Sequence, residues 1–140
     1  MASNSLNTAL ENGYKNFLDS LNLSCSVYRM LPSGSLEVTT PCIFVVANKG
    51  SELKYESGIF KIPFECKVVY VAQDLQDNPT GLDVLTNAVE TALTGSRSYI
   101  NSTSNDTFLF SVTKPSNPSI DVVEHTYQYT IALDIVCKNK

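Results

Sequence analysis

The sequence predicts an α+β domain in which one mainly antiparallel β-sheet is packed by two α-helices. Two segments, residues 59–73 and 121–137, alternate apolar and polar side chains with the period of two that β-strands use. Two others, residues 5–21 and 81–94, repeat apolar side chains at helical spacing. The predicted order, α-β-β-β-α-β-β, is typical of α+β proteins because helices and parallel strands do not alternate regularly.

Length and composition favour a folded single domain over residues 1–140. A chain of 140 residues can bury a substantial core, and its 17% charged residues are too few for a disordered chain. The net charge of −4 argues against a general nucleic-acid binder, which needs a basic face. The first residues lack the basic and apolar regions of a secretory signal, and no apolar run is long enough to span a bilayer. We therefore expect a protein made in the cytoplasm, without a membrane partner.

In the first part of the chain we expect a helix and two strands. Ser3 or Ser5 can cap the helix, which runs to about Leu21. Its apolar face consists of Leu6, Leu10, Tyr14, Phe17 and Leu21. A short strand is expected over residues 26–31. Residues 42–47 are apolar on both faces, which predicts a central strand that is covered on both sides.

The middle of the chain predicts a long strand followed by a helix. Residues 59–73 form the strand, and Pro63 lies on its outward side, where its missing N–H indicates an edge or a bulge. Asp77, Asn78 and Pro79 interrupt it. The helix over residues 81–94 has an apolar stripe and stops at Gly95, a usual helix end.

The last part predicts a polar loop over residues 102–106, a strand over 107–113, a break over 114–118 and a final long strand over 121–137. Unbroken, the last strand would reach about 55 Å at roughly 3.3 Å per residue. A domain of this length has a radius of gyration of only about 14 Å. The two long strands must therefore bend, carry a bulge or project beyond their core, and a projecting strand has edges that invite another subunit.

The starts of the long strands are our candidate subunit interface. Its residues are Phe60, Ile62, Phe64, Tyr127 and Tyr129. The loops over residues 51–57 and 114–120 are further candidates.

Residues with chemical potential are few, and each has a structural interpretation. His125 is the single histidine and lies near the start of the last strand, where we expect it at a sheet margin. Glu65 and Lys67 are spaced as in Mg²⁺-dependent nucleases, but alternation places them on the solvent face, where an ion pair explains them. Asp74, Asp77 and Asp83 suit turn and helix-cap positions. We expect no catalytic, cofactor-binding or metal-binding residues, and therefore no enzyme.

The four cysteines are predicted to be reduced thiols. Cys25, Cys42, Cys66 and Cys137 lie far apart without a C-x-x-C pair, and three of them fall in apolar strand patterns. Free cysteine behaves as a small buried apolar residue. A zinc site is disfavoured because its ligands usually come in closely spaced pairs.

The layout resembles the tail terminator (tail completion) and neck proteins of long-tailed bacteriophages. The resemblance covers nearly the whole chain and is a pattern of elements, not an invariant signature. The matching pieces are the N-terminal amphipathic helix, the apolar strand over residues 41–45, the long strand through 67–71, the break after it, the helix over 82–93 with its V-E-x-A-L sequence, and the closing strand through 131–137.

The resemblance implies a structural virion protein of the tail or neck. Such proteins form a ring, typically a hexamer, that caps the tail tube, stops its polymerisation and offers a surface to the head–tail connector. DNA passes through the lumen without specific binding. The alternative that we carry forward is a small non-catalytic adaptor or host-interaction module.

Overall fold

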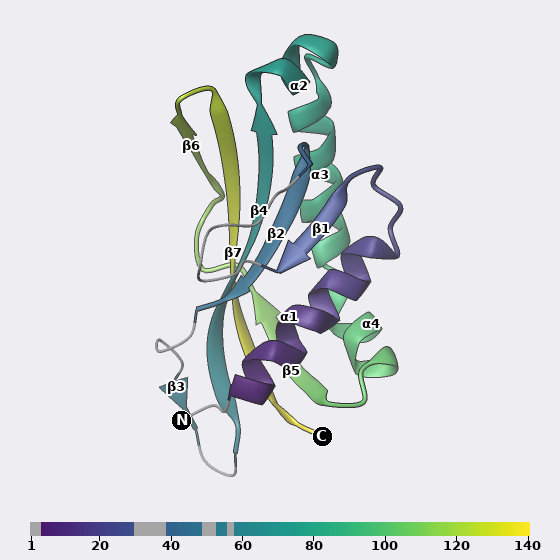
Figure 1. Cartoon of the computed structure of the whole chain (residues 1–140). Coiled ribbons are helices and arrows are strands. Elements are labelled where there is room, and N and C mark those ends of the chain that lie inside the picture. Colours follow the sequence, from purple (N-terminus) through teal and green to yellow (C-terminus); the bar gives the residue numbers. More distant parts are fainter. Residues whose placement is uncertain (1–3, 30–38, 49–52, 56–57) are drawn as a thin grey trace.

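The computed structural model describes residues 4–29, 39–48, 53–55 and 58–140. Within them it contains four helices and a seven-stranded sheet (Figure 1). The helices are α1 (Asn4–Asp19), α2 (Ala72–Asp77), α3 (Gly81–Leu93) and α4 (Ser96–Thr103). The strands are β1 (Ser26–Arg29), β2 (Cys42–Ala47), β3 (Leu53–Lys54), β4 (Phe60–Val71), β5 (Thr107–Thr113), β6 (Ser119–Val123) and β7 (Thr126–Asn139). The chain is therefore an α+β fold with one main sheet.

The sheet has the strand order β1-β2-β4-β7-β5. Only β1 and β2 are parallel among the described pairs; all the others are antiparallel. The long strands β4 and β7 are neighbours and pair along all 12 residues of β4. Two short strands extend the sheet from this central pair: β3 pairs with the start of β4, and β6 pairs with the start of β7.

The core lies between the sheet and the helices. Helices α1, α3 and α4 lie on one side of the sheet (Figure 1). On β4 and β7 the side chains of one parity are buried there, as the alternation predicts. The largest fully buried side chains include Tyr14, Phe64, Leu10, Ile100 and Ile131. We call this side the helix face of the sheet and the opposite side its open face.

Several predicted elements are confirmed, with boundaries that differ by a few residues. Strands β2 and β5 have the expected bounds, and helix α3 ends one residue earlier than expected. Helix α1 ends at Asp19, before the expected Leu21. Ser5 lies inside this helix, whereas Ser3 and the end of the first expected strand lie outside the described residues.

Helices α2 and α4 were not predicted. Helix α2 continues directly from β4, and its Asp74 carboxylate accepts a hydrogen bond from the Val71 N–H at 2.9 Å. Helix α4 replaces part of the expected polar loop. Its sequence, SRSYINST, has a weak helical signal, and tertiary contacts hold it: Ile100 is fully buried, and Ser96 hydrogen-bonds the Tyr14 hydroxyl at 2.9 Å.

The predicted final strand over residues 121–137 is wrong as a single element. The chain turns at Glu124 and His125, so that β6 and β7 form a hairpin. Both turn residues have positive φ, 47° and 67°, as a two-residue type I′ turn requires. The alternation of apolar and polar side chains runs through the turn, because valines precede it and tyrosines follow it. The Glu-His pair also lacks the usual Asn-Gly signal of a two-residue turn.

A buried glutamate joins the first helix to the edge of the sheet. Glu11 on α1 is only 1% exposed. Its Oε1 accepts hydrogen bonds from Arg29 Nε at 3.1 Å and Nη2 at 2.8 Å, and its Oε2 accepts one from the Ala47 N–H at 2.8 Å. The carboxylate thus connects α1, β1 and β2 through charge-assisted bonds.

Among the helices of the described residues, none is long and apolar enough to cross a membrane.

We expect Glu11→Ala to lower the free energy of unfolding by about 2–3 kcal/mol, because it leaves the Arg29 guanidinium and the Ala47 N–H without their acceptor. Urea unfolding followed by circular dichroism measures the change. Glu11→Gln keeps one acceptor oxygen and is the matched control, with a smaller loss. An effect of Glu11→Ala within about 0.5 kcal/mol, as at ordinary surface sites, would contradict this role.

Candidate assembly surface

Three of the five residues predicted for a subunit interface lie in the core. Phe60, Ile62 and Phe64 are 6%, 0% and 0% exposed and project from β4 onto the helix face. The sequence pattern identified an apolar face correctly, but the chain's own helices cover it. In this structure these side chains are not available to a second subunit, so the prediction for them is corrected.

Tyr127 and Tyr129 are half-buried on the same face of β7. Tyr127 is paired with Tyr70, and Tyr129 with Val68, across the central strand pair. The Tyr129 hydroxyl donates a hydrogen bond to Glu90 Oε1 on α3 at 2.5 Å. Both rings pack against the core cluster and help to attach the start of β7 to the helical layer.

The β6–β7 hairpin presents exposed apolar residues that the sequence pattern did not identify as an interface. Ile120, Val122 and Val123 on β6 are 52%, 57% and 66% exposed. All five residues of β6 are exposed, and the hairpin stands at one end of the sheet (Figure 1). A strand with exposed valines and an isoleucine at a sheet edge is a typical site for pairing with another chain. The candidate loop over residues 114–120 includes Ile120, the first of these apolar residues. Of the other candidate loop, over residues 51–57, the structure describes residues 53–55, in which Leu53 and Tyr55 are also exposed.

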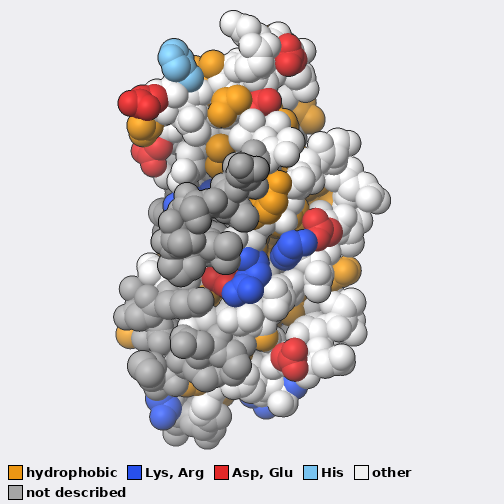
Figure 2. Space-filling model, viewed as in Figure 1, with side chains coloured by type: hydrophobic (Ala, Val, Ile, Leu, Met, Phe, Trp, Pro, Cys, Tyr) orange, Lys and Arg blue, Asp and Glu red, His pale blue; other side chains and the backbone are white. Residues whose placement is uncertain are grey.

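The end of the molecule that carries the hairpin is acidic. Residues 115–137 contain no Lys or Arg, and Asp121 and Glu124 are exposed. In Figure 2 acidic and hydrophobic side chains lie together at this end, beside the single histidine. His125 lies in the turn, not on the strand, and its carbonyl accepts a hydrogen bond from the Ala72 N–H at 2.8 Å. This bond connects the hairpin turn to the start of α2.

Glu90 attaches the base of the hairpin to α3. One carboxylate oxygen accepts the Tyr129 hydroxyl, and the other accepts Lys114 Nζ at 3.0 Å. The bond from Tyr129, together with the Lys114 charge, lowers the pKa of Glu90 below its ordinary value. Desolvation and the Glu90 carboxylate raise the pKa of Tyr129 to about 12. The pair therefore holds an ionised glutamate against a neutral phenol.

On the open face of the sheet, charged side chains pair with each other. Lys67 Nζ lies 3.8 Å from Glu65 Oε1, which confirms the predicted ion pair on one side of β4. Asp134 on the neighbouring strand lies 3.5 Å from Lys61 Nζ. Within the described part of the chain, no group of three His, Cys, Asp or Glu side chains could hold a metal ion.

Three cysteines are buried within strands, as predicted. Cys42, Cys66 and Cys137 are fully buried, whereas Cys25 is half-buried. Burial raises the pKa of the Cys66 thiol to about 12, so the group stays protonated at neutral pH. Buried protonated thiols serve as small apolar packing groups.

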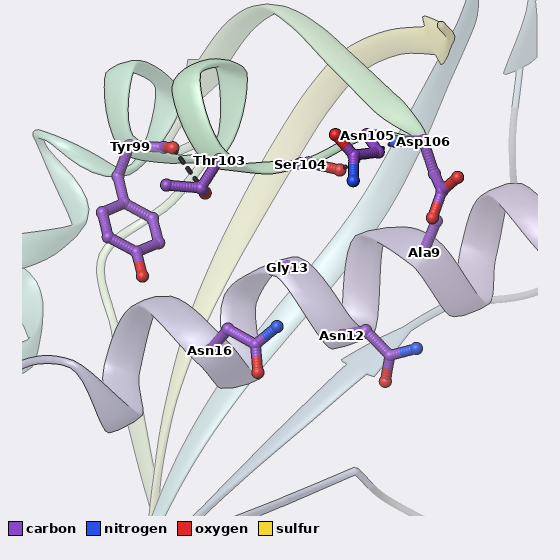
Figure 3. Close-up of a pocket in the computed structure, with 9 residues that line it drawn as sticks. All are labelled: Ala9, Asn12, Gly13, Asn16, Tyr99, Thr103, Ser104, Asn105 and Asp106. Carbon is purple, nitrogen blue, oxygen red and sulfur yellow. Dashed lines mark hydrogen bonds between the residues drawn. The ribbon is translucent and has the colours of Figure 1, made fainter.

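A polar groove between α1 and α4 has a volume of about 410 Å³ (Figure 3). Asn12 and Asn16 project from α1, and the Tyr99 ring points toward that helix. Among the described residues that line it, Asp106 has the only charged side chain. The groove is open and mostly amide- and hydroxyl-lined, without a paired acid and base or a nucleophile beside a histidine. It therefore offers no recognisable catalytic arrangement.

We expect the Glu90 contacts to stabilise the folded protein at neutral pH and to lose this contribution in acid. Because the pKa of Glu90 is lower in the folded chain, its contribution is present above the ordinary glutamate pKa of about 4.3 and is lost as pH falls through the folded value. Thermal unfolding of the wild type and of Glu90→Gln between neutral and acidic pH tests this. The difference between their midpoints should shrink on acidification; a constant difference would exclude the linkage.

Comparison with known proteins yields no assignment. No model of a known protein family matches the sequence, and no curated protein matches it significantly.

Proposed function

We propose that this chain is a structural assembly protein of the tail-terminator kind, which forms a ring on the end of a phage tail tube. The observation that carries the proposal is the β6–β7 hairpin, an exposed sheet edge with apolar side chains at the end of two long strands. The sequence resemblance to tail terminators supplies the biological setting. Connector and tail-tube proteins would then be its partners, and DNA would pass through the ring.

The chemistry of the described residues supports a non-catalytic role. The acidic and basic groups on the open face are paired with each other, and the acidic hairpin end lacks lysine and arginine. An acidic surface repels a phosphate backbone, which suits a passage for DNA better than a DNA-binding site.

Light scattering over a range of protein concentrations, followed by negative-stain imaging with and without tail-tube protein, tests the proposal. We expect closed rings, alone or on tube ends, and shorter tubes when the protein is present during tube polymerisation. A strict monomer that leaves tube length and tube ends unchanged would reject the terminator function and favour an adaptor.

We expect Val123→Asp to weaken self-association about tenfold or more, equivalent to roughly 1.4 kcal/mol, because it adds a charge to the apolar edge. Sedimentation over a concentration series measures the effect. Val84→Asp is the matched control: Val84 is 65% exposed but lies on α3, away from β6. Equal effects of the two substitutions would show that the hairpin is not a special surface.

A further inference from the structure

We propose that the outer edge of β6 pairs, antiparallel, with the β3 segment of a second copy of this chain, so that one sheet continues into the next. The inference rests on the proposed ring-forming function and names the contact that would build the ring. The acceptor segment is Leu53–Lys54 with Tyr55 after it. The contact is heterologous, because two different surfaces meet, and repeated heterologous contacts form a ring when the rotation between successive copies closes.

The two outer edges beside β7 differ in how they are protected. On β5, the Asn101 side chain accepts the Leu109 N–H at 2.7 Å and donates to the Leu109 carbonyl at 2.9 Å, as a neighbouring strand would. Arg97 also donates to that carbonyl, at 3.2 Å. In contrast, no hydrogen bond from the described residues reaches the outer side of β6. Helix α4 thus closes the β5 edge, whereas none of the described residues closes the β6 edge.

The hairpin geometry identifies which backbone groups of β6 point outward. A two-residue hairpin closes on a hydrogen-bonded pair, here Val123 with Thr126, and hydrogen-bonded and non-hydrogen-bonded pairs then alternate. The N–H and C=O groups of Val122 and Ile120 therefore point away from β7. They form a short row of backbone donors and acceptors that a further strand can pair.

The β3 segment offers a complementary row at the opposite end of the sheet. Tyr55 N–H donates to the Ile59 carbonyl at 2.7 Å, so Tyr55 faces β4 and the preceding Lys54 turns its backbone groups outward. Leu53 and Tyr55 are 58% and 46% exposed. The β6 and β3 segments together hold five of the seven exposed large hydrophobic side chains among the described residues.

When Lys54 pairs with Val122, the helix face of one copy continues into the helix face of the next. Register places Lys54 and Val122 on the helix face, because Lys54 lies opposite Phe60 and Val122 opposite Tyr127. Leu53 then lies opposite Val123 on the open face, where two apolar side chains meet. Both copies keep the same orientation, so their helices stay on one side of the continued sheet.

Charge favours this pairing over a twofold contact between two hairpins. Two β6 strands in their longest antiparallel overlap would place Asp121 directly opposite its own copy, and like charges in that position are destabilising. Residues 115–137 offer no lysine or arginine to compensate. In the β6–β3 register Asp121 lies opposite the uncharged Tyr55 instead, so that no two like charges face each other.

Disulfide trapping between separately prepared variants tests the contact. In a Cys25→Ser background, Leu53→Cys and Val123→Cys are made as single variants, mixed and oxidised mildly. Their positions form a non-hydrogen-bonded pair in the proposed register, where Cα atoms lie about 4.5 Å apart, within the range of a disulfide. Both residues are exposed, so folding is preserved, and circular dichroism checks it. Leu53→Cys mixed with Val84→Cys is the matched control.

We expect a disulfide-linked dimer as the main product of the mixture and little product from either variant alone. A variant that carries both Leu53→Cys and Val123→Cys should give a ladder of linked oligomers. Dimers from an Asp121→Cys variant alone would reveal the twofold hairpin contact, in which this residue lies opposite its own copy, and would overturn the proposal. Equal product with Val84→Cys, or no product at the highest soluble concentration, would also overturn it.

The same samples separate this inference from the proposed function. Rings that form in solution or on tail tubes without the Leu53–Val123 link would leave the terminator function standing and reject the β6–β3 contact. A linked ladder that neither binds tube ends nor limits tube length would support the contact and reject the terminator function.

Discussion

The antiparallel pairing of β4 with β7 is the constraint on which the rest of the structure depends. Its 12 residue pairs align two strands that are distant in sequence, and it sets which side chains of each strand reach the helix face. Four of the remaining strands attach directly to this pair, β2 and β3 to β4, and β5 and β6 to β7, whereas β1 attaches through β2. A shift of register by one residue would move every core side chain of a strand to the open face.

Because β7 is longer than either strand on its outer side, two strands share that side. β5 pairs with residues 134–139 of β7, and β6 with residues 126–130. The edge that α4 reaches is closed by the Asn101 side chain, whereas the edge beyond its reach is open. The length mismatch between β7 and its neighbours thus creates the exposed hairpin, which the proposed assembly would cover.

Polar anchors attach the helical layer to this framework. Glu11 joins α1 to β1 and β2, and Glu90 joins α3 to β7 and to the loop before β6. In both cases a carboxylate accepts two or more hydrogen bonds, so its charge is satisfied where it is partly or fully removed from water. The Glu90 anchor holds the base of the hairpin and thereby orients its edge relative to the core.

The sequence by itself determined the α+β class, the long strand β4, helix α3 and the burial of Cys42, Cys66 and Cys137, because periodicity reports directly which side chains leave water. It also identified the apolar face of β4, but not what covers that face. Only the tertiary structure decided that Phe60, Ile62 and Phe64 belong to the core, that the last run turns back at Glu124 and His125, and that the exposed edge is β6. Those outcomes depend on contacts between residues distant in the chain, and on backbone angles for which Glu-His carries no local signal.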